Sequence, residues 1–526
     1  MQATVYRVAF VALSILLVPL LLFKPFHIDD TVVLHVAANI LRDPLRPFAG
    51  DFFWLEEPQP LQRVTTNPPL VSYWLALFIA LGGYREWWLH LSFMPFVALL
   101  GWGMYRLAER WLGAGWGWWA TGWVLLSPAV LPGMNVMRDV PALALFVGGF
   151  ACWVEGLAQA NRRLLVMGAL LGGLSGVAKY TALFWIPLAL LYALQQRAYH
   201  AMGWLILAVM PITLWSALCW LMHGEVHLLY LWQERRGSAP WEAKLLPGVV
   251  GLGASLLLHW AVLPRWLLEI RHALGLLAGL AALSYWHWSL FVNRPFYANT
   301  QFWLLSGGAL LGLALWRSVA RWEPSDPLEK GTRRFLLVWL VLALGAAAWG
   351  VPFQAMRHLL YALPPLVLLL LNLAGKRSLL LLAQGVLSLM VLAADYEYAR
   401  TYRDYAREAA QQYRGARVWY AGSWGWMFYA EQRGFRKLLP DGRGLQAGDL
   451  VIVPQRVYKG KMPPGFEQQA QLIAVRTYAA RLPLRTMDFE GAAYYAIIRT
   501  NAPFRPEINR ANPLERFRVY RWQPQP

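Results

Sequence analysis

The residues most able to do chemistry in this sequence are acids at the ends of long apolar segments. Asp29 and Asp30 directly follow the first apolar segment, and Asp139 precedes a later one. A carboxylate where a membrane helix meets water can activate a hydroxyl by taking its proton, or it can hold a cation. It is also costly to desolvate there. We therefore expect the chemistry to lie in the first external loop, around Asp29.

Basic side chains flank the same kind of segment and indicate an anionic ligand. They are Lys179, Arg235, Arg294 and Arg357. Such cations can clamp a phosphate group while a lipid tail attached to it stays in the membrane. The alternative is that each charge only reaches to the membrane surface or pairs with a neighbour. For Asp29, which lies beside a second acid, we favour the functional interpretation.

Composition places these residues in a membrane protein. Of the 526 residues, 58% are hydrophobic and 15% are charged, and the mean hydropathy is +0.37. The net charge of +19 falls largely in short loops, as the positive-inside bias explains, so we expect no nucleic-acid partner. Cys152 and Cys219 lie within apolar segments and indicate neither disulfides nor a zinc site. The long apolar segments stop at about residue 394. We therefore predict a membrane domain over 1–394 and a soluble domain over 395–526.

The apolar segments predict a polytopic α-helical membrane protein of about thirteen spans, with Asp29 and the tail on the outer side. The predicted spans are 8–23, 89–107, 115–131, 140–157, 164–178, 182–194, 201–222, 246–263, 273–291, 302–315, 335–351, 359–373 and 379–393. The short segment 70–83 is assigned to an interfacial or re-entrant helix of the first loop, 25–88, because this choice places the basic clusters inside. The run 164–194 is too long for one span, so we expect a break that puts Lys179 at the outer surface.

Five motifs, in order, resemble the GT-C superfamily of integral-membrane glycosyltransferases, in particular the branch of protein O-mannosyltransferases and lipid A aminoarabinose transferases. The motifs are the acid pair Asp29-Asp30, Asn67-Pro68-Pro69-Leu70, Asp139-Val140-Pro141, Gly176-Val177-Ala178-Lys179, and Arg357 through Pro364-Pro365. No single motif is specific, but their order, with the spans and an outer C-terminal domain, is typical of this superfamily. The resemblance covers about residues 1–375.

The resemblance implies a donor whose sugar is linked to a polyprenyl phosphate such as undecaprenyl phosphate, and an acceptor that enters from the periplasm. It implies Asp29 as the general base for the acceptor hydroxyl, with Asp30 as its support. Lys179 would bind the donor phosphate and stabilise its charge as it leaves. Arg235, Arg294 and Arg357 would assist Lys179. Asp139 would help to position the acceptor or Arg138. The cavity would be lined by Arg138, Tyr180, Glu234, Arg236 and Asn67.

A divalent cation is left open. His27, Asp29 and Asp30, with Glu56, could supply nitrogen and oxygen ligands, although their spacing is not diagnostic. Asn67 stands where relatives often carry Lys or His, so we do not expect it to contact the donor or a metal directly.

The tail is predicted to be a small periplasmic α/β domain that caps the cavity or selects the acceptor. Helices are expected at 396–412 and 426–431, and strands at 416–420, 449–454 and 492–498. The Gly422-Ser423-Trp424-Gly425 turn lacks the spacing of a nucleophile elbow, so hydrolase chemistry is not expected there.

The sequence thus predicts an inner-membrane glycosyltransferase that moves a hexose or pentose to lipid A, a polysaccharide or a protein. The competing interpretation is a transporter or a flippase for lipid-linked glycans. Such a protein would need broken helices in repeated halves and ionisable residues at mid-membrane. No internal repeat is evident, and the charges gather on one face. A non-catalytic relative that binds a lipid-linked glycan is a third interpretation, against which the intact acid pair argues.

Overall fold

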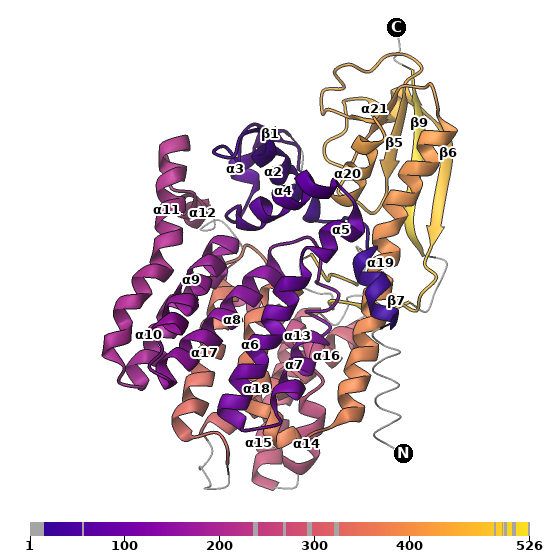
Figure 1. Ribbon diagram of the computed structural model, residues 1–526. Helices are drawn as coiled ribbons and strands as arrows, with labels where there is room; N and C mark the ends of the chain where they lie inside the picture. The colour runs from indigo at the N-terminus through magenta and orange to yellow at the C-terminus, as the bar shows by residue number, and fades with distance from the viewer. Residues whose placement is uncertain are drawn as a thin grey trace.

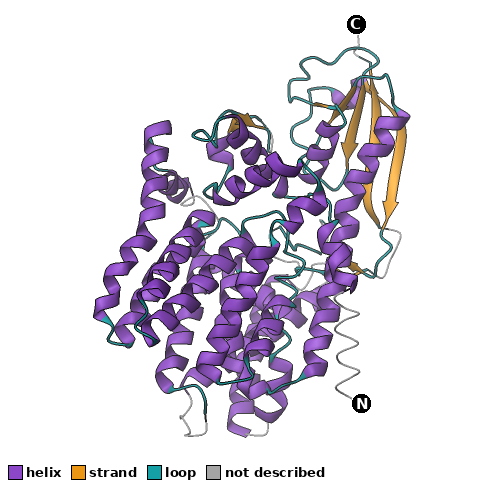
Figure 2. Ribbon diagram, in the orientation of Figure 1, coloured by secondary structure: helices purple, strands orange, loops and turns teal. Residues whose placement is uncertain are grey.

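The computed structural model describes residues 15–54, 57–234, 240–266, 270–291, 297–319, 326–488, 491–496, 498, 502–507 and 512–523. Its long helices form a bundle, a layer of short helices covers one end of that bundle, and a domain with a β-sheet lies beside the layer (Figures 1 and 2).

The bundle is built from apolar helices that bury aliphatic and aromatic side chains against one another. They are α6 (Met94–Leu112), α7 (Gly117–Leu125), α8 (Asp139–Ala158), α9 (Arg162–Ala178), α10 (Trp185–Gln195), α11 (Ile206–His223), α13 (Glu242–Ser255), α14 (His259–Trp266), α15 (Ile270–Phe291), α16 (Tyr297–Val319), α17 (Lys330–Trp349), α18 (Leu363–Ala374) and α19 (Ser378–Gln412). Short 3-10 helices precede α10, α11 and α18, namely η1 (Tyr180–Phe184), η2 (Tyr199–Leu205), η4 (Met356–His358) and η5 (Leu360–Ala362).

Within the described residues, six helical stretches are long and apolar enough to cross a membrane, judged by length and composition. They are Glu86–Leu112, Asp139–Ala158, Tyr199–His223, Tyr297–Val319, Lys330–Trp349 and Ser378–Gln412. Shorter apolar helices lie beside them, among them α10 and α18. A multi-span helical architecture is therefore supported, whereas the predicted number of spans is not confirmed.

The predicted span 115–131 is not a continuous helix. Helix α7 stops at Leu125, and the chain is irregular from there to Arg138. Pro128 and Pro132 explain the difference, because a proline cannot donate the hydrogen bond that continues a helix.

The predicted span 246–263 is also broken, because α13 ends at Ser255 and α14 starts at His259. Two neighbouring side chains satisfy the backbone at this break. The Leu257 N–H donates to the Gln384 amide oxygen at 3.0 Å, and the Ser127 hydroxyl donates to the Ser255 carbonyl at 2.7 Å. Such partners allow irregular backbone inside an apolar bundle, and hydropathy alone does not reveal them.

The break at Lys179 is found as predicted. Helix α9 ends at Ala178, Lys179 is extended with φ −155° and ψ 123°, and η1 follows. The Lys179 side chain is buried rather than exposed at a surface.

The layer over the bundle is formed by the first loop. It contains α2 (Asp30–Arg42), β1 (Asp51–Phe52), β2 (Gln59–Pro60), α3 (Leu61–Val64), α4 (Leu70–Gly82) and α5 (Glu86–Leu91). Helix α2 packs on α4, and the Ser72 hydroxyl of α4 donates to the Val33 carbonyl of α2 at 3.1 Å. With 13 residues, α4 is shorter than a bilayer span requires. Helix α12 (His227–Glu234) lies near this layer at the end of α11 (Figure 1).

The C-terminal domain contains a five-stranded mixed sheet of order β4-β3-β5-β9-β6. Its strands are β3 (Val418–Tyr420), β4 (Arg436–Lys437), β5 (Leu450–Pro454), β6 (Ala470–Ala479) and β9 (Pro513–Trp522). Strand β3 is parallel to β4 and β5, whereas β9 is antiparallel to β5 and β6. Helices α20 (Trp424–Gln432) and α21 (Phe466–Gln469) complete the domain, and β7 (Leu484–Arg485) pairs with β8 (Arg505–Pro506) outside the main sheet.

Helix α19 joins the bundle to the sheet. It runs for 35 residues without a break, so residue 394, the proposed domain boundary, lies inside one helix. Figure 1 shows it rising out of the bundle and continuing beside the sheet. Its Tyr405 ring stacks on Phe517 of β9, with centroids 4.0 Å apart, which fixes the helix to the sheet.

The predicted strand over 492–498 is wrong. Among its described residues, single bridges form instead, from Ala493 to Met487 and from Ala492 to Ala502. The apolar character of the segment has another cause, because Tyr494 and Tyr495 are buried against the bundle. The Tyr494 hydroxyl donates to the Pro128 carbonyl at 2.8 Å.

Candidate functional site

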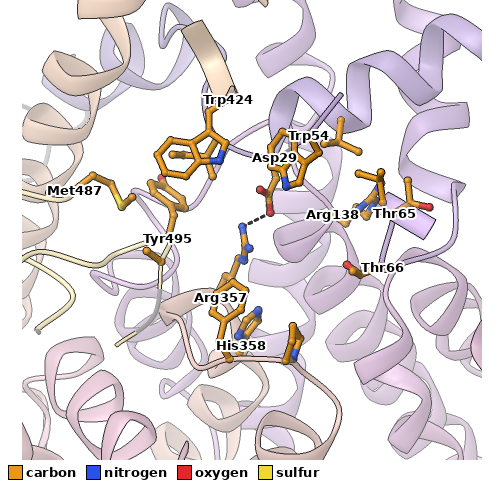
Figure 3. A pocket seen from close by; sticks show the side chains of 16 residues that line it. Asp29, Trp54, Thr65, Thr66, Arg138, Arg357, His358, Trp424, Met487 and Tyr495 are labelled. Carbon is orange, nitrogen blue, oxygen red and sulfur yellow. Dashed lines mark ion pairs between the residues drawn. The ribbon is translucent and has the colours of Figure 1, made fainter. Parts of the chain in front are cut away.

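A cavity of about 490 Å³ lies where the first loop, the end of the bundle and the C-terminal domain meet. We call it the main cavity. It is lined by Ile28, Asp29, Val32, Trp54, Val64, Thr65, Thr66, Arg138, Pro352, Phe353, Arg357, His358, Trp424, Met487, Tyr495 and Ala496. Figure 3 shows several of these side chains converging from opposite walls. A smaller space of about 60 Å³ shares five of these residues and adds Asn67, Asp139 and Lys179. We call it the inner end.

Asp29 occupies the wall between the two spaces. It lies at the N-terminus of α2, but its carboxylate does not cap the helix. Instead, Asp29 Oδ2 lies 2.6 Å from Arg357 Nη1, the ion pair drawn as a dashed line in Figure 3. The carboxylate keeps 32% of its side-chain exposure, so a ligand in the cavity can reach it.

The backbone before Asp29 is strained. Ile28 has a φ of 50°, which is rare for a β-branched residue because its Cβ then crowds the following carbonyl. Trp424, another lining residue of the main cavity, has a φ of 64°. Strain of this kind collects at functional sites, where the surrounding structure holds it in place.

Asp139 and Lys179 form a second ion pair at the inner end. Lys179 Nζ donates to Asp139 Oδ1 at 2.5 Å, and both side chains are buried. The Arg357 carbonyl lies 3.4 Å from the same ammonium. Asn67 lies beside this pair, and its amide oxygen accepts from the Tyr180 N–H at 3.3 Å.

Arg138 is the cation of the site with unused donors. It lines both the main cavity and its inner end, and its exposure is only 8%. In the described part of the chain, its Nε and Nη2 have no hydrogen-bond partner. A buried guanidinium donor without a partner is costly. This cost favours an anionic ligand that accepts from Arg138.

The inner end carries an excess of positive charge. Three basic side chains, Arg138, Lys179 and Arg357, face two acidic ones, Asp29 and Asp139. His358 adds a hydrogen-bonding group, and its Nδ1 accepts from the Ala355 N–H at 3.2 Å. The ring nitrogen that carries the proton is then Nε2. The site is therefore suited to a ligand with a single negative charge.

Three residues predicted for the site lie elsewhere. Asp30 is fully buried on the other side of the chain turn, where its Oδ2 accepts from the His27 N–H at 3.0 Å. Tyr180 is buried with its hydroxyl 2.9 Å from His227 Nδ1. Glu234 is exposed at the end of α12. Arg235, Arg236 and Arg294 lie outside the described residues, as does Glu56.

The proposed metal ligands do not converge. The His27 ring lies 3.1 Å from Asp395 and 3.5 Å from Asp30, whereas Asp29 is turned toward Arg357. Among the residues that the structure describes, no group of three or more His, Cys, Asp or Glu side chains is placed to hold a metal ion. The arrangement of His27, Asp29 and Asp30 thus does not fit a shared cation.

The aromatic walls of the main cavity could not be predicted from motifs. Trp54 comes from the first loop, and Trp424 and Tyr495 come from the C-terminal domain (Figure 3). The Tyr495 hydroxyl donates a hydrogen bond to Asp395, and Trp424 follows the Gly422-Ser423 turn.

No protein-family model matches the sequence, and no curated protein matches it either. Two solved structures are similar to it, both of ArnT from Cupriavidus metallidurans. The structure bound to undecaprenyl phosphate has a TM-score of 0.47 and 14% sequence identity, and the apo structure has a TM-score of 0.46 and 15% identity. Each comparison covers 90% of this chain and 97% of the other.

Proposed function

We propose that this chain is a membrane glycosyltransferase that moves a sugar from a polyprenyl-phosphate donor to an acceptor hydroxyl. The observation that carries the proposal is Arg138, a buried guanidinium with unused donors beside the Asp29–Arg357 pair. The excess of one positive charge at the inner end matches the single negative charge of a sugar phosphodiester. The transferred sugar is a hexose or pentose, and the acceptor is lipid A, a polysaccharide or a protein.

The phosphate is proposed to bind at the inner end. Arg138 would donate to it in a fork, a geometry that suits guanidinium and phosphate. Lys179 and Arg357 would add positive charge within the same space. When the bond between the anomeric carbon and the phosphate oxygen breaks, the electron pair stays on that oxygen. The phosphate then gains a second negative charge, which preorganised cations stabilise most in the transition state.

Asp29 is proposed as the general base. The acceptor hydroxyl would enter the main cavity, lose its proton to the Asp29 carboxylate and form the new bond to the anomeric carbon. Arg357, already paired with Asp29, would hold the carboxylate in position. Asp139 would keep Lys179 oriented toward the phosphate.

The proposed location is the bacterial inner membrane, with the cavity and the domain 395–526 on the periplasmic side. Support comes from the six apolar helical stretches and from the cavity at one end of the bundle. A lipid-linked donor could then keep its tail among the helices while its phosphate reaches the inner end.

The test is Asp29→Asn in the full chain, assayed with a synthetic undecaprenyl-phosphate sugar. We expect turnover to fall by about 10²–10⁴-fold, the range that a general base contributes, while undecaprenyl phosphate still binds. Asp51→Asn is the matched control, because Asp51 is an exposed acid of the same loop. Near-normal turnover in the Asp29 variant would refute the role of base. Movement of lipid across proteoliposomes without sugar transfer would contradict the enzyme assignment.

A further inference from the structure

A second pocket of about 310 Å³ lies on the other face of α2, between that helix and α20. We call it the outer pocket. Thr31, His35 and Ala38 supply one wall, since residues three and four apart share a face of a helix. Phe428 and Glu431 of α20 supply the facing wall, and Phe52 and Tyr84 close the sides.

The outer pocket combines flat rings with hydrogen-bonding groups. The His35 and Phe52 rings lie 4.6 Å apart, and Tyr84 and Phe428 lie 6.2 Å apart. Glu431 and Gln432 are exposed at its rim. Burial, together with nearby Arg42, lowers the pKa of His35, so its neutral ring offers one donor and one acceptor. Mostly apolar walls with a few polar groups are typical of sites for small ligands.

The charge of the outer pocket is opposite to that of the inner end. Its described lining contains Glu431 and no Lys or Arg. A phosphate would gain no cation here, so this pocket does not suit the donor head group. A ring with hydroxyl groups fits better, because its apolar face can pack on an aromatic ring while its hydroxyls bond to Glu431, Gln432 and His35.

Stacked aromatic side chains join the walls of the outer pocket and the main cavity. Phe52 of the outer pocket stacks on Trp54 of the main cavity, with centroids 6.0 Å apart and planes 26° apart. Helix α20 makes the same connection, because Trp424 lines the main cavity and Phe428, one turn later, lines the outer pocket. A ligand made of linked sugar rings could therefore extend along these aromatic side chains from one space to the other.

We infer that the outer pocket is a subsite for sugar units of the acceptor, which is then an uncharged or cationic oligosaccharide. The inference rests on the proposed function, since it places the reacting hydroxyl of that oligosaccharide near Asp29. The stack of Phe52 on Trp54 carries the sugar units between the two spaces. A protein acceptor or a simple lipid would leave the polar rim of the outer pocket unused.

The test measures direct binding of oligosaccharides to the full chain in detergent by ligand-observed NMR. The probes are neutral tetrasaccharides of glucose, mannose, galactose and N-acetylglucosamine. We expect at least one to bind, and Phe428→Leu to weaken it about fivefold to tenfold, since the leucine fills space without an aromatic face. Glu431→Gln should weaken it less. The glutamine still offers an oxygen to the Tyr420 hydroxyl, which donates to Glu431 at 2.5 Å, so the domain should fold.

Two controls separate this inference from the proposed function. Glu467→Gln, an exposed acid of the same domain, should leave binding unchanged. Arg138→Gln should weaken binding of undecaprenyl phosphate about 10–100-fold and leave oligosaccharide binding intact. The subsite is refuted if no tetrasaccharide binds, or if the Phe428 and Glu431 variants bind it as tightly as the wild type does. This holds whether or not undecaprenyl phosphate binds. Competition by decanoate alone, with no sugar bound, would assign the pocket to an acyl chain and overturn the inference.

Discussion

Arg138 is the residue whose surroundings say most about a ligand. Sequence order predicted that acids and bases would gather, and Asp29, Asp139, Lys179 and Arg357 do line the main cavity or the adjoining inner end. The pairing inside the set could not be predicted, because Asp29 and Arg357 meet only where the first loop packs on the end of the bundle. The unused donors of Arg138 were equally hidden, since they depend on which neighbours are already paired.

We predict that Arg138→Gln weakens binding of undecaprenyl phosphate about 10–100-fold, as expected for the loss of a charged hydrogen-bond donor. Arg138→Lys should fall between this variant and the wild type, because lysine keeps the charge but loses the fork. Binding can be measured by isothermal titration in detergent. The control is Arg110→Gln, because Arg110 is an exposed arginine in the last turn of α6 and lines neither the main cavity nor its inner end. Equal affinity in all four proteins would exclude Arg138 from the phosphate site.

At the level of elements, one buried acid of α19 ties together segments that are far apart in the chain. Asp395 pairs with Lys24, and its Oδ2 lies 3.1 Å from His27 Nε2. The Tyr495 hydroxyl donates to Asp395 at 2.6 Å, and the Thr486 hydroxyl donates to it at 3.1 Å. This cluster holds both the approach to Asp29 and the Tyr495 wall of the main cavity.

Asp395→Asn should destabilise the protein by about 3–5 kcal/mol, because it leaves Lys24 buried without a counter-charge. Lys24→Met combined with Asp395→Asn should recover much of this loss, since no unpaired charge remains. Thermal unfolding of the purified variants measures both effects. A double variant less stable than Asp395→Asn alone would show that charge pairing is not what Asp395 contributes.

Strand β9 contains a buried acid that makes stability depend on pH. Burial raises the pKa of Glu515 from 4.5 to about 7, against the opposing effect of hydrogen bonds from three backbone N–H groups and Tyr402. Between these two values the folded protein binds more protons than the unfolded one, so stability should fall as pH rises from about 4.5 to about 7. Unfolding by urea across this range measures the slope. Glu515→Gln should flatten it, and an unchanged slope would assign it to other groups.

Element prediction succeeded where hydropathy was uninterrupted and failed where side chains satisfy broken backbone. Helices α8, α9, α16 and α17 lie where the apolar runs predicted them. The break at Ser255 depends on Gln384, whose contact cannot be deduced from local sequence. The segment around Tyr495 was apolar enough for a strand, but its tyrosines are buried against another domain instead.

At the scale of the whole molecule, the proposed topology puts the sheet domain outside and the start of α9 inside. The Arg443 side chain is 80% exposed. In cells with a permeable outer membrane, the cysteine of Arg443→Cys should therefore react with a membrane-impermeant maleimide. A cysteine at Arg163 should react only after the inner membrane is also opened. Both natural cysteines are buried and should give little background. The reverse labelling pattern would invert the topology.

Under the proposed function, the ion pair between Asp29 and Arg357 implies an order of events. A phosphate arriving at the inner end competes with Asp29 for the same guanidinium, so it weakens the hold of Arg357 on the carboxylate. The Asp29 carboxylate is then freer to contact the acceptor hydroxyl once a donor is present than before. Since such coupling is reciprocal, a protonated Asp29 leaves Arg357 freer to grip the phosphate that departs. The pair thus links the arrival of one substrate to the activation of the other, and an acceptor that enters an empty site meets a carboxylate already engaged.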